Sequence, residues 1–366
     1  MWLMLLDPTE PQPAMRRPAK RVAIVDDSRS IRSWLRHVLQ QDKRLEVVGE
    51  AGDAETARKV IKETQPDVLT LDVQMPGMSG LVFLERLMTL HPMPVVMVSA
   101  STSSGSDTAI QALSLGAVDC IVKPGQSVSK LSAKDIARRV YSAACSQYQP
   151  LLKRSALQPV APLEAEEKDG AIVLIGASTG GVTALETVLA TMATDGPPTV
   201  IVQHMPATFL ISFAKLLDRK LPHDVGLVDD RVPLRRGQVR LAPEVGRQTE
   251  LVRRNGLWQG HLRDDAERGA HCPSVDALFC SAAPYGHDVI AAILTGLGRD
   301  GTEGMRLLHR SGAHTIGQDA DSSVVYGMPK AAWEAGAIVE QLPIENIGEA
   351  INSAVAAHHR RRSFAR

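Results

Sequence analysis

Short apolar runs alternate with segments of helical periodicity along the first part of the chain. Ile31, Leu35, Val38 and Leu39 are spaced as on one face of a helix, whereas the short apolar runs are typical of buried strands. We expect strands at residues 22–25, 45–50, 68–71, 95–98 and 120–122. We expect helices at residues 30–40, 54–63, 80–90, 106–115 and 134–145. Strands that alternate with helices in this way predict a parallel, doubly wound α/β sheet.

A second alternating series begins near residue 171. Its predicted strands are 171–175, 199–203, 238–242, 289–294 and 313–318, with a short hairpin near 250–258. The series predicts a second, mostly parallel α/β domain. The segment between the two series contains prolines and a charged cluster without a sustained period, so we interpret it as a linker. The boundaries that follow are a disordered tail at 1–20, a first domain at 21–146, a linker at 147–169, a second domain at 170–357 and a basic tail at 358–366.

Length and composition agree with this division and exclude several classes of protein. A chain of 366 residues favours two domains, and 41 basic against 41 acidic residues give no basic excess for nucleic-acid binding. The four cysteines form no metal-ligand pair and are expected to be reduced thiols. The apolar start is too short for a signal peptide, and Met15 is an alternative start to Met1. No run reaches the ~18 apolar residues of a membrane span, so we expect a cytoplasmic protein without membrane insertion.

Acidic residues follow two of the predicted strands in the first domain. Asp26 and Asp27 come directly after the first strand, and Asp72 follows the third. Ligands of open α/β sheets bind at the carboxyl ends of strands, where converging carboxylates repel one another unless a cation such as Mg²⁺ joins them. Ser99 and Lys123 end the fourth and fifth strands, so a hydroxyl and an ammonium group reach the same edge. An aspartate at a strand end is often only a helix cap, but the whole set suits a phosphoryl group.

The first domain resembles the receiver domain of bacterial two-component response regulators. The motifs that carry the resemblance are Val25-Asp26-Asp27-Ser28, Leu71-Asp72-Val73-Gln74-Met75-Pro76-Gly77 and Val122-Lys123-Pro124. It implies a flavodoxin-like fold, Asp72 as phosphoacceptor, and Mg²⁺ held by Asp26, Asp27, Asp72 and the backbone carbonyl of Gln74. It also implies that Lys123 pairs with the phosphoryl group and that Ser99 moves onto it. Cys120 or Ile121 stands where many receivers carry a switch aromatic, which leaves the route of the switch open.

Ser178 lies in the most informative turn of the second domain. The apolar run at 172–175 is followed by Gly176-Ala177-Ser178-Thr179-Gly180-Gly181 and then by a helix-compatible stretch at 182–189. A serine at this corner lies at the amino end of a helix, which favours negative charge. The glycines do not follow the dinucleotide or P-loop patterns. From this motif alone, a phosphate site, a nucleophile and a structural turn remain possible readings.

Two further strand ends favour the nucleophile. His204 follows the strand at 199–203, beside Ser178 in a parallel sheet, where it can act as general base. Asp300 lies in a glycine-rich loop after the strand at 289–294 and can orient the imidazole. Each of the two residues alone is more often structural. Together with Ser178 they predict a catalytic triad in a chain order that differs from that of the α/β-hydrolases.

The chain as a whole resembles the chemotaxis-type protein-glutamate methylesterase and glutamine deamidase family. The matching motifs are residues 175–181, Gln203-His204-Met205-Pro206, Pro273-Ser274-Val275-Asp276, residues 294–301 and Tyr326-Gly327-Met328-Pro329. The resemblance implies hydrolysis of glutamate γ-methyl esters on chemoreceptors, deamidation of receptor glutamines, a chemotaxis histidine kinase as phosphodonor, and no cofactor for the esterase reaction. It also suggests the backbone N–H groups of Leu297 and Thr179 as oxyanion donors. Leu297 replaces a usual methionine, Gln248 stands where a histidine is expected, and Cys272 where an arginine is common.

Two alternatives remain open at this point. The second domain could be a catalytically silent signalling adaptor, although the intact triad argues against it. The same chemistry could instead serve a non-flagellar chemosensory array, which one sequence does not separate from chemotaxis. Regulation of transcription is disfavoured, because no helix-turn-helix or basic recognition stretch follows the first domain.

Overall fold

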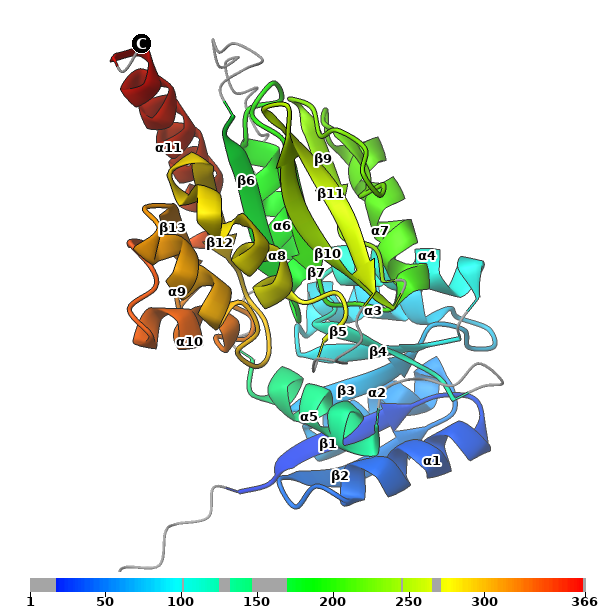
Figure 1. The fold of residues 1–366 in the computed structure, drawn as a ribbon. Coiled ribbons are helices and arrows are strands. Elements are labelled where there is room, and N and C mark those ends of the chain that lie inside the picture. Colours follow the sequence, from blue (N-terminus) through cyan, green and yellow to red (C-terminus); the bar gives the residue numbers. More distant parts are fainter. Residues whose placement is uncertain are drawn as a thin grey trace, which may run out of the picture.

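The computed structural model describes residues 18–100, 102–124, 132–146, 170–244, 246–264 and 271–364. The predicted N-terminal tail as far as residue 17 and the predicted linker at 147–169 lie outside the described residues. Figure 1 shows two α/β units, the first in blue and cyan and the second running from green to red.

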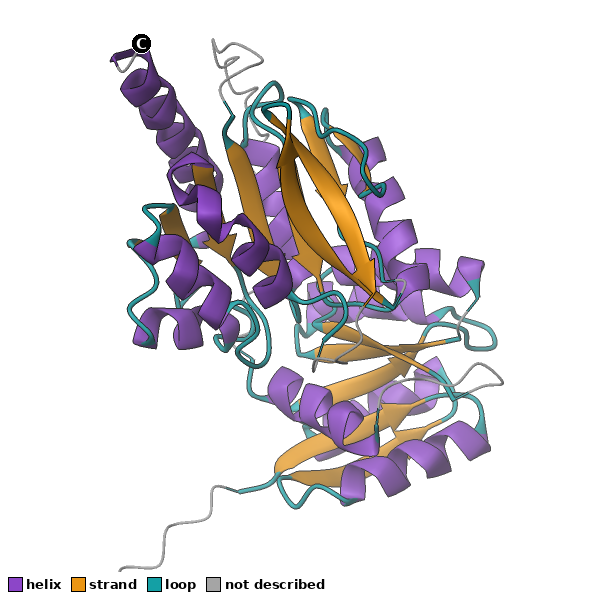
Figure 2. Cartoon of the chain, in the orientation of Figure 1, coloured by secondary structure: helices purple, strands orange, loops and turns teal. Residues whose placement is uncertain are grey.

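The first domain is a doubly wound parallel sheet, as predicted. In the part of residues 18–146 that the structure describes, the sheet has five strands in the order β2-β1-β3-β4-β5, with every neighbouring pair parallel. Helices α1 and α5 pack on one face, and α2, α3 and α4 pack on the other (Figure 2). The elements are β1 (Lys20–Val25), α1 (Arg29–Gln40), β2 (Leu45–Ala51), α2 (Ala54–Thr64), β3 (Val68–Asp72), α3 (Gly80–Leu90), β4 (Val95–Ser99), α4 (Ser103–Ser114), β5 (Asp119–Val122) and α5 (Ala133–Ala144). Each predicted element of this domain is confirmed to within three residues at either end.

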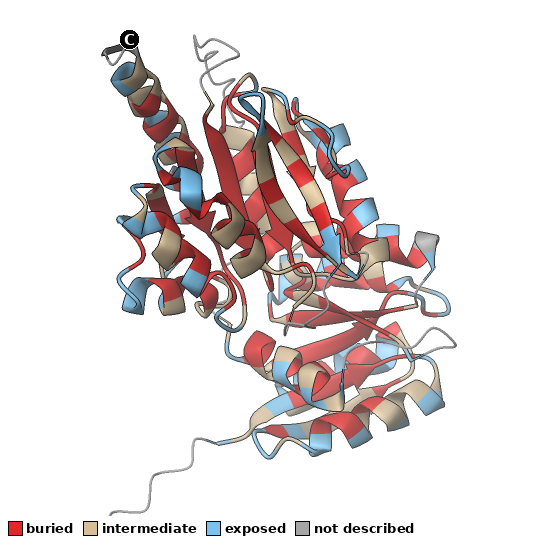
Figure 3. Cartoon of the chain, in the orientation of Figure 1, coloured by how far each residue is buried: buried red, intermediate tan, exposed pale blue. Residues whose placement is uncertain are grey.

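Local chemistry explains where these helices begin. Ser28, Asp53, Ser79 and Ser132 each accept a backbone N–H at a helix start, and this satisfies one of the groups that a helix leaves unpaired. The central strands β3 and β4 are mostly apolar because helices cover both faces of the sheet, and they are buried throughout (Figure 3). The helix starts therefore lie next to the strand ends that carry the acidic residues.

The second domain is also a parallel α/β sheet, and it carries a separate hairpin. Within the described part of residues 170–364 the main sheet has seven strands in the order β14-β13-β12-β6-β7-β9-β8, all paired in parallel. The antiparallel hairpin is β10 (Arg247–Arg254) with β11 (Leu257–Asp264), longer than the predicted 250–258. The other elements are β6 (Ile172–Ala177), α6 (Gly181–Thr191), β7 (Thr199–Gln203), α7 (Ala207–Lys220), β8 (Asp224–Leu227), β9 (Gln238–Leu241), α8 (Val275–Ala282), the 3-10 helix η1 (Ala283–Asp288), β12 (Val289–Ile293), α9 (Thr302–Arg310), β13 (His314–Gln318), α10 (Met328–Glu334), β14 (Glu340–Leu342) and α11 (Ile344–Phe364).

The C-terminal helix changes the predicted boundary at residue 357. Helix α11 continues to Phe364, so it runs through most of the segment that was expected to be a basic tail. His358 is buried, and its Nε2 lies 2.9 Å from Oδ1 of Asp288. The interpretation of this segment as a solvated end is therefore wrong for His358, because one face of the helix packs on the domain.

Strand order brings the predicted catalytic loops together. Strand β6 lies between β12 and β7, with Gly176 paired to Ile293 on one side and Ala177 paired to Gln203 on the other. Because the three strands run parallel, the segments that follow them emerge at one edge of the sheet. Ser178, His204 and the loop that carries Asp300 all follow these strands.

The two domains pack against each other through α4. This helix of the first domain lies against α6 and α7 of the second domain, as the cyan and green helices show in Figure 1. Apolar residues of α4, such as Ile110 and Leu113, belong to the same buried cluster as Leu210 and Leu217 of α7. The hydrophobic core is therefore continuous across the domain boundary.

Candidate active site

The turn that carries Ser178 is held from both sides. Its N–H donates to the carbonyl of Thr295 at 3.0 Å, and its carbonyl accepts the N–H of Gly181 at 2.8 Å. Gly180 has φ of +78°, and a Cβ there would lie 2.6 Å from Cβ of Val324, so both backbone conformation and space require glycine. The serine is thus presented at the carboxyl end of β6 and the amino end of α6.

His204 and Asp300 form a hydrogen-bonded pair beside this turn. Nε2 of His204 lies 2.8 Å from Oδ2 of Asp300, and both side chains are buried. Within the described residues, Nδ1 of His204 has no hydrogen-bond partner. When Nε2 carries the proton, Nδ1 is left as the free basic nitrogen.

Asp300 accepts three more hydrogen bonds besides the one from His204. They come from the hydroxyl of Ser274 at 2.8 Å, the N–H of Val275 at 2.8 Å and the N–H of Asp276 at 3.0 Å. Burial disfavours the charged carboxylate, but the hydrogen bond and charge of His204 and these backbone donors outweigh it and hold the pKa of Asp300 well below its ordinary value. Asp300 is therefore ionised in the folded protein at neutral pH.

Two residues near the pair had no role in the sequence prediction. Ser274 caps α8 and at the same time bonds Asp300, and its signal is the Pro-Ser-Val-Asp stretch before an apolar helix. The ring of His271 stacks on His204, with centroids 4.3 Å apart and planes 12° from parallel. Burial, followed by the charge of His204, lowers the pKa of His271. Nothing in the local sequence marks this stack, because it depends on chain segments 67 positions apart.

The first domain covers the site. Ser178 and His204 line a cavity of about 20 Å³ between the domains, which is room for about one water molecule. Thr179 donates its hydroxyl to Oδ2 of Asp119 at 3.0 Å, and the N–H of Gly180 donates to the carbonyl of Val118 at 3.2 Å. These contacts come from the start of β5 and leave no space for a substrate side chain.

The two predicted oxyanion donors, Thr179 and Leu297, lie in different positions relative to the cavity. Thr179 lines the cavity, whereas Leu297 is not among its lining residues and lies half-buried in the loop after Gly296. No hydrogen bond joins the Ser178 hydroxyl to the His204 ring among the described residues, and such contacts are often loose before substrate binds. The structure therefore brings Ser178, His204, Asp300 and Thr179 to one edge, with Leu297 in an adjacent loop.

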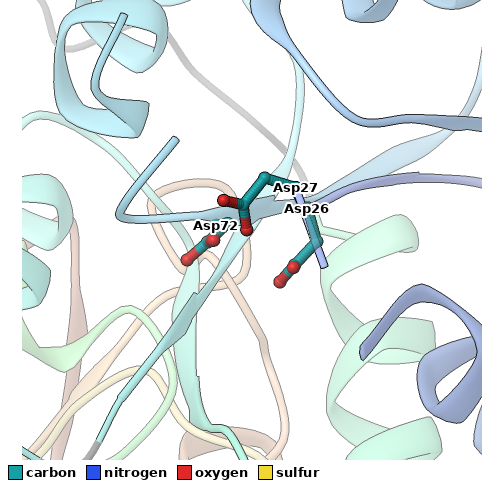
Figure 4. Close-up of side chains that lie close together, drawn as sticks. All are labelled: Asp26, Asp27 and Asp72. Atoms are coloured by element: carbon teal, nitrogen blue, oxygen red, sulfur yellow. The ribbon is translucent and has the colours of Figure 1, made fainter. Parts of the chain in front are cut away.

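A second cluster lies at the carboxyl edge of the first sheet. Oxygen atoms of Asp26, Asp27 and Asp72 all lie within 4.8 Å of one another, and Figure 4 shows the three side chains side by side. Nζ of Lys123 lies 2.8 Å from Oδ2 of Asp26 and 2.8 Å from Oδ2 of Asp72. The N–H of Gln74 donates to Oδ1 of Asp72 at 3.1 Å. Three hard oxygen donors at this spacing fit a Mg²⁺ ion.

Electrostatics in this cluster favour a bound cation. Burial raises the pKa of Asp72, which the hydrogen bond from Lys123 only partly offsets. Burial lowers the pKa of Lys123, but its hydrogen bonds to Asp26 and Asp72 outweigh burial, so that pKa is raised. The hydroxyl of Ser99 donates to the carbonyl of Gly105 at 3.0 Å and so points at α4 in this structure.

Fold and site together define a serine-hydrolase-like α/β domain that is covered by a receiver-like domain. Models of two protein families match the chain: the response regulator receiver domain over residues 22–134 and CheB methylesterase over residues 173–351. A protein-glutamate methylesterase/protein-glutamine glutaminase of Agrobacterium fabrum is 44% identical over 337 residues, covering 90% of this chain and 95% of that protein. Its counterpart in Rhizobium etli is 45% identical over 345 residues, covering 94% of this chain and 98% of that protein. The chain belongs to the protein-glutamate methylesterase/protein-glutamine glutaminase family.

The crystal structure of the Thermotoga maritima CheB methylesterase catalytic domain is 35% identical and covers 51% of this chain and 99% of that chain, with a TM-score of 0.49. Among the described residues, no helix is long and apolar enough to cross a membrane.

Proposed function

We propose that this chain hydrolyses glutamate γ-methyl esters on chemoreceptors, releasing methanol, deamidates receptor glutamines, and is controlled by phosphorylation of Asp72. The observation that carries the proposal is the buried His204–Asp300 pair at the strand end beside Ser178, closed over by the receiver domain. The names of the relatives support the substrate class. A chemotaxis-type histidine kinase is the proposed phosphodonor in the cell.

Ser178 attacks the γ-carbonyl of the substrate, and His204 takes its proton. Because Nε2 of His204 bonds Asp300, Nδ1 is the nitrogen that receives the proton. Asp300 fixes the tautomer and stabilises the imidazolium that forms, and its lowered pKa keeps it ionised during the reaction. The Thr179 and Leu297 backbone N–H groups are the proposed donors to the oxyanion.

One site serves both activities because the steps after attack are shared. Collapse of the tetrahedral intermediate breaks the bond to methoxide, which leaves as methanol with the proton from His204. A glutamine substrate loses ammonia by the same path. Water, deprotonated by His204, then cleaves the acyl-enzyme and leaves glutamate.

Phosphorylation takes place at the acidic cluster of the receiver. Asp26, Asp27 and Asp72 would hold Mg²⁺ with the Gln74 carbonyl, and the ion would neutralise charge on the transferring phosphoryl group. Lys123 is already within 2.8 Å of Asp72 and pairs with the new phosphoryl group, while Ser99 turns from the Gly105 carbonyl towards it.

Strand β5 links this cluster to the esterase site. Lys123 directly follows its last residue, and its first residue, Asp119, contacts Thr179 beside the nucleophile. A change at Asp72 that shifts β5 and α4 therefore acts on the contacts that close the cavity. The receiver inhibits the esterase until it is phosphorylated.

Methanol release from methylated receptor membranes tests the proposal. Wild-type protein should release methanol faster when a small-molecule phosphodonor and Mg²⁺ are present, and Ser178→Ala should release none above background. Asn352→Leu, which alters a half-buried contact of α11 with the end of α6, is the matched control and should keep its activity. Wild-type methanol release by Ser178→Ala would sink the assignment, and an inactive wild type that binds receptors would favour the adaptor.

A further inference from the structure

Gln203 is a buried polar residue that contacts the backbone of two of the three predicted catalytic residues. It is the last residue of β7, directly before His204, and is 2% exposed. Its Nε2 donates to the carbonyl of Ser178 at 2.9 Å and to the carbonyl of His204 at 3.3 Å. One side-chain amide thus joins the turn of the nucleophile to the strand end of the base.

The orientation of this amide is fixed by chemistry and by packing. Both contacts of Nε2 are carbonyl oxygens, so a flipped amide would place three acceptors together. Oε1 of Gln203 is buried and has no hydrogen-bond partner among the described residues. It lies so close to Gly181 that a Cβ on this glycine would come within 2.0 Å of it. An unpaired buried acceptor costs about 1–3 kcal/mol, so Oε1 of Gln203 lowers the stability of the fold in this position.

The bond to Ser178 also sets the direction of an oxyanion donor. In a trans peptide the C=O and N–H groups point to opposite sides of one plane. Gln203 and the Gly181 N–H both hold the Ser178 carbonyl, so the Thr179 N–H of the same peptide is directed away from them. Thr179 lines the cavity beside Ser178. If this peptide rotated, both Ser178 and the N–H donor of Thr179 would change position.

We propose that Gln203 is a positioning residue for the esterase reaction, which orients the Ser178–Thr179 peptide and anchors the backbone of His204. This inference rests on the proposed function only in taking Ser178 as the nucleophile. It assigns to Gln203 an effect on the chemical step, not on substrate affinity, because its amide is 2% exposed and bonds the backbone of Ser178 and His204.

The test uses the full-length chain, saturated with phosphodonor and Mg²⁺, in two assays. Gln203→Met keeps the length of the side chain without a donor, and Gln203→Glu places an oxygen against the two carbonyls. In methanol release, each of these two substitutions should lower kcat by about 10- to 100-fold while KM changes by less than about threefold. Reaction of Ser178 with an organophosphonate fluoride should slow by a similar factor, since that probe needs the nucleophile and the oxyanion donors but not the receptor.

Gly181→Ala is a second variant that leaves Gln203 in place. Its added methyl group displaces the amide, so it should reproduce the loss of kcat with unchanged KM. Asn352→Leu is the matched control, because the Asn352 amide also bonds two backbone groups, Ala193 N–H and Thr191 carbonyl, away from the site. It should lose comparable stability in a urea melt and keep kcat.

Several results would overturn the role of Gln203. The first is a wild-type kcat in folded Gln203→Met. The second is a Gln203 variant in which KM changes and kcat does not. The third is a loss of kcat in Asn352→Leu as large as that in the Gln203 variants. If wild-type protein reacts with the phosphonate but releases no methanol, the proposed substrate is wrong, and the labelling rates still decide the role of Gln203.

Discussion

Asp119 provides the most direct test of how the receiver closes the esterase site. Its carboxylate accepts the Thr179 hydroxyl across the domain boundary at 3.0 Å and pairs with Arg139 of α5 at 3.1 Å. Its side chain is 12% exposed and that of Arg139 is 16% exposed, so solvent screens the contacts only weakly. Asp119→Ala removes this cross-domain hydrogen bond and the pair with Arg139, and it leaves the Gly180–Val118 bond and the residues of the second domain unchanged.

The size of the effect follows from the type of bond that is lost. A hydrogen bond to a charged group contributes about 1.5–3 kcal/mol, and every 1.4 kcal/mol changes an equilibrium about tenfold. The ratio of open to closed protein should therefore rise by roughly 10- to 100-fold. Since basal activity follows the open fraction, methanol release without phosphodonor should rise by a similar factor while the open form is a minority.

The assay compares basal and stimulated methanol release in five proteins: wild type, Asp119→Ala, Thr179→Val, the double variant and a control. Thr179→Val removes the same bond from the other side and keeps its backbone N–H, so Asp119→Ala should add less than about threefold in that background. Glu55→Gln, which removes an exposed ion pair with Lys59 on α2, should leave the basal rate unchanged. An unchanged basal rate in folded Asp119→Ala would refute the argument that this contact keeps the site closed.

Three further predictions follow from the two sites and the C-terminal helix. Asp300→Asn should reduce kcat by about 10³- to 10⁴-fold with little change in KM, because the amide no longer holds the reactive tautomer of His204; steady-state kinetics would contradict this if kcat fell less than tenfold. Asp72→Asn should abolish stimulation by phosphodonor, while removal of residues 1–165 should raise basal methanol release, and equal basal rates of truncated and full-length chains would reject inhibition by the receiver. Burial opposes ionisation of Asp288, but its bonds to His358 and Arg253 outweigh this and lower its pKa, so its stabilisation is present above the ordinary carboxyl pKa and is lost as the pH falls below it. Asp288→Asn should cost about 1–3 kcal/mol at pH 7, and urea unfolding should show a smaller difference from wild type at pH 3.

The sequence predicted most of the elements because their signals are local. Buried parallel strands such as β3 and β7 are short, continuous apolar runs, and the helices between them have a clear amphipathic period. Strands β8 and β14 were missed since each has only three or four residues and lies at a sheet edge, where polar residues are tolerated. The helical continuation of the second domain beyond residue 357 was missed because its basic residues hide a buried face around His358.

Ser178, His204 and Asp300, and likewise Asp26, Asp72 and Lys123, could be named from the sequence alone. Each follows an apolar strand, and parallel strands end at one edge, so a position along the chain predicts a position in space. Only the tertiary structure decided that β6 lies between β7 and β12, that Ser274 and His271 surround the His204–Asp300 pair, and that Gln203 holds the Ser178 carbonyl. It also decided that Asp119 contacts Thr179, next to Ser178. These contacts join segments far apart in the chain, and no local period of hydrophobic and polar residues encodes them.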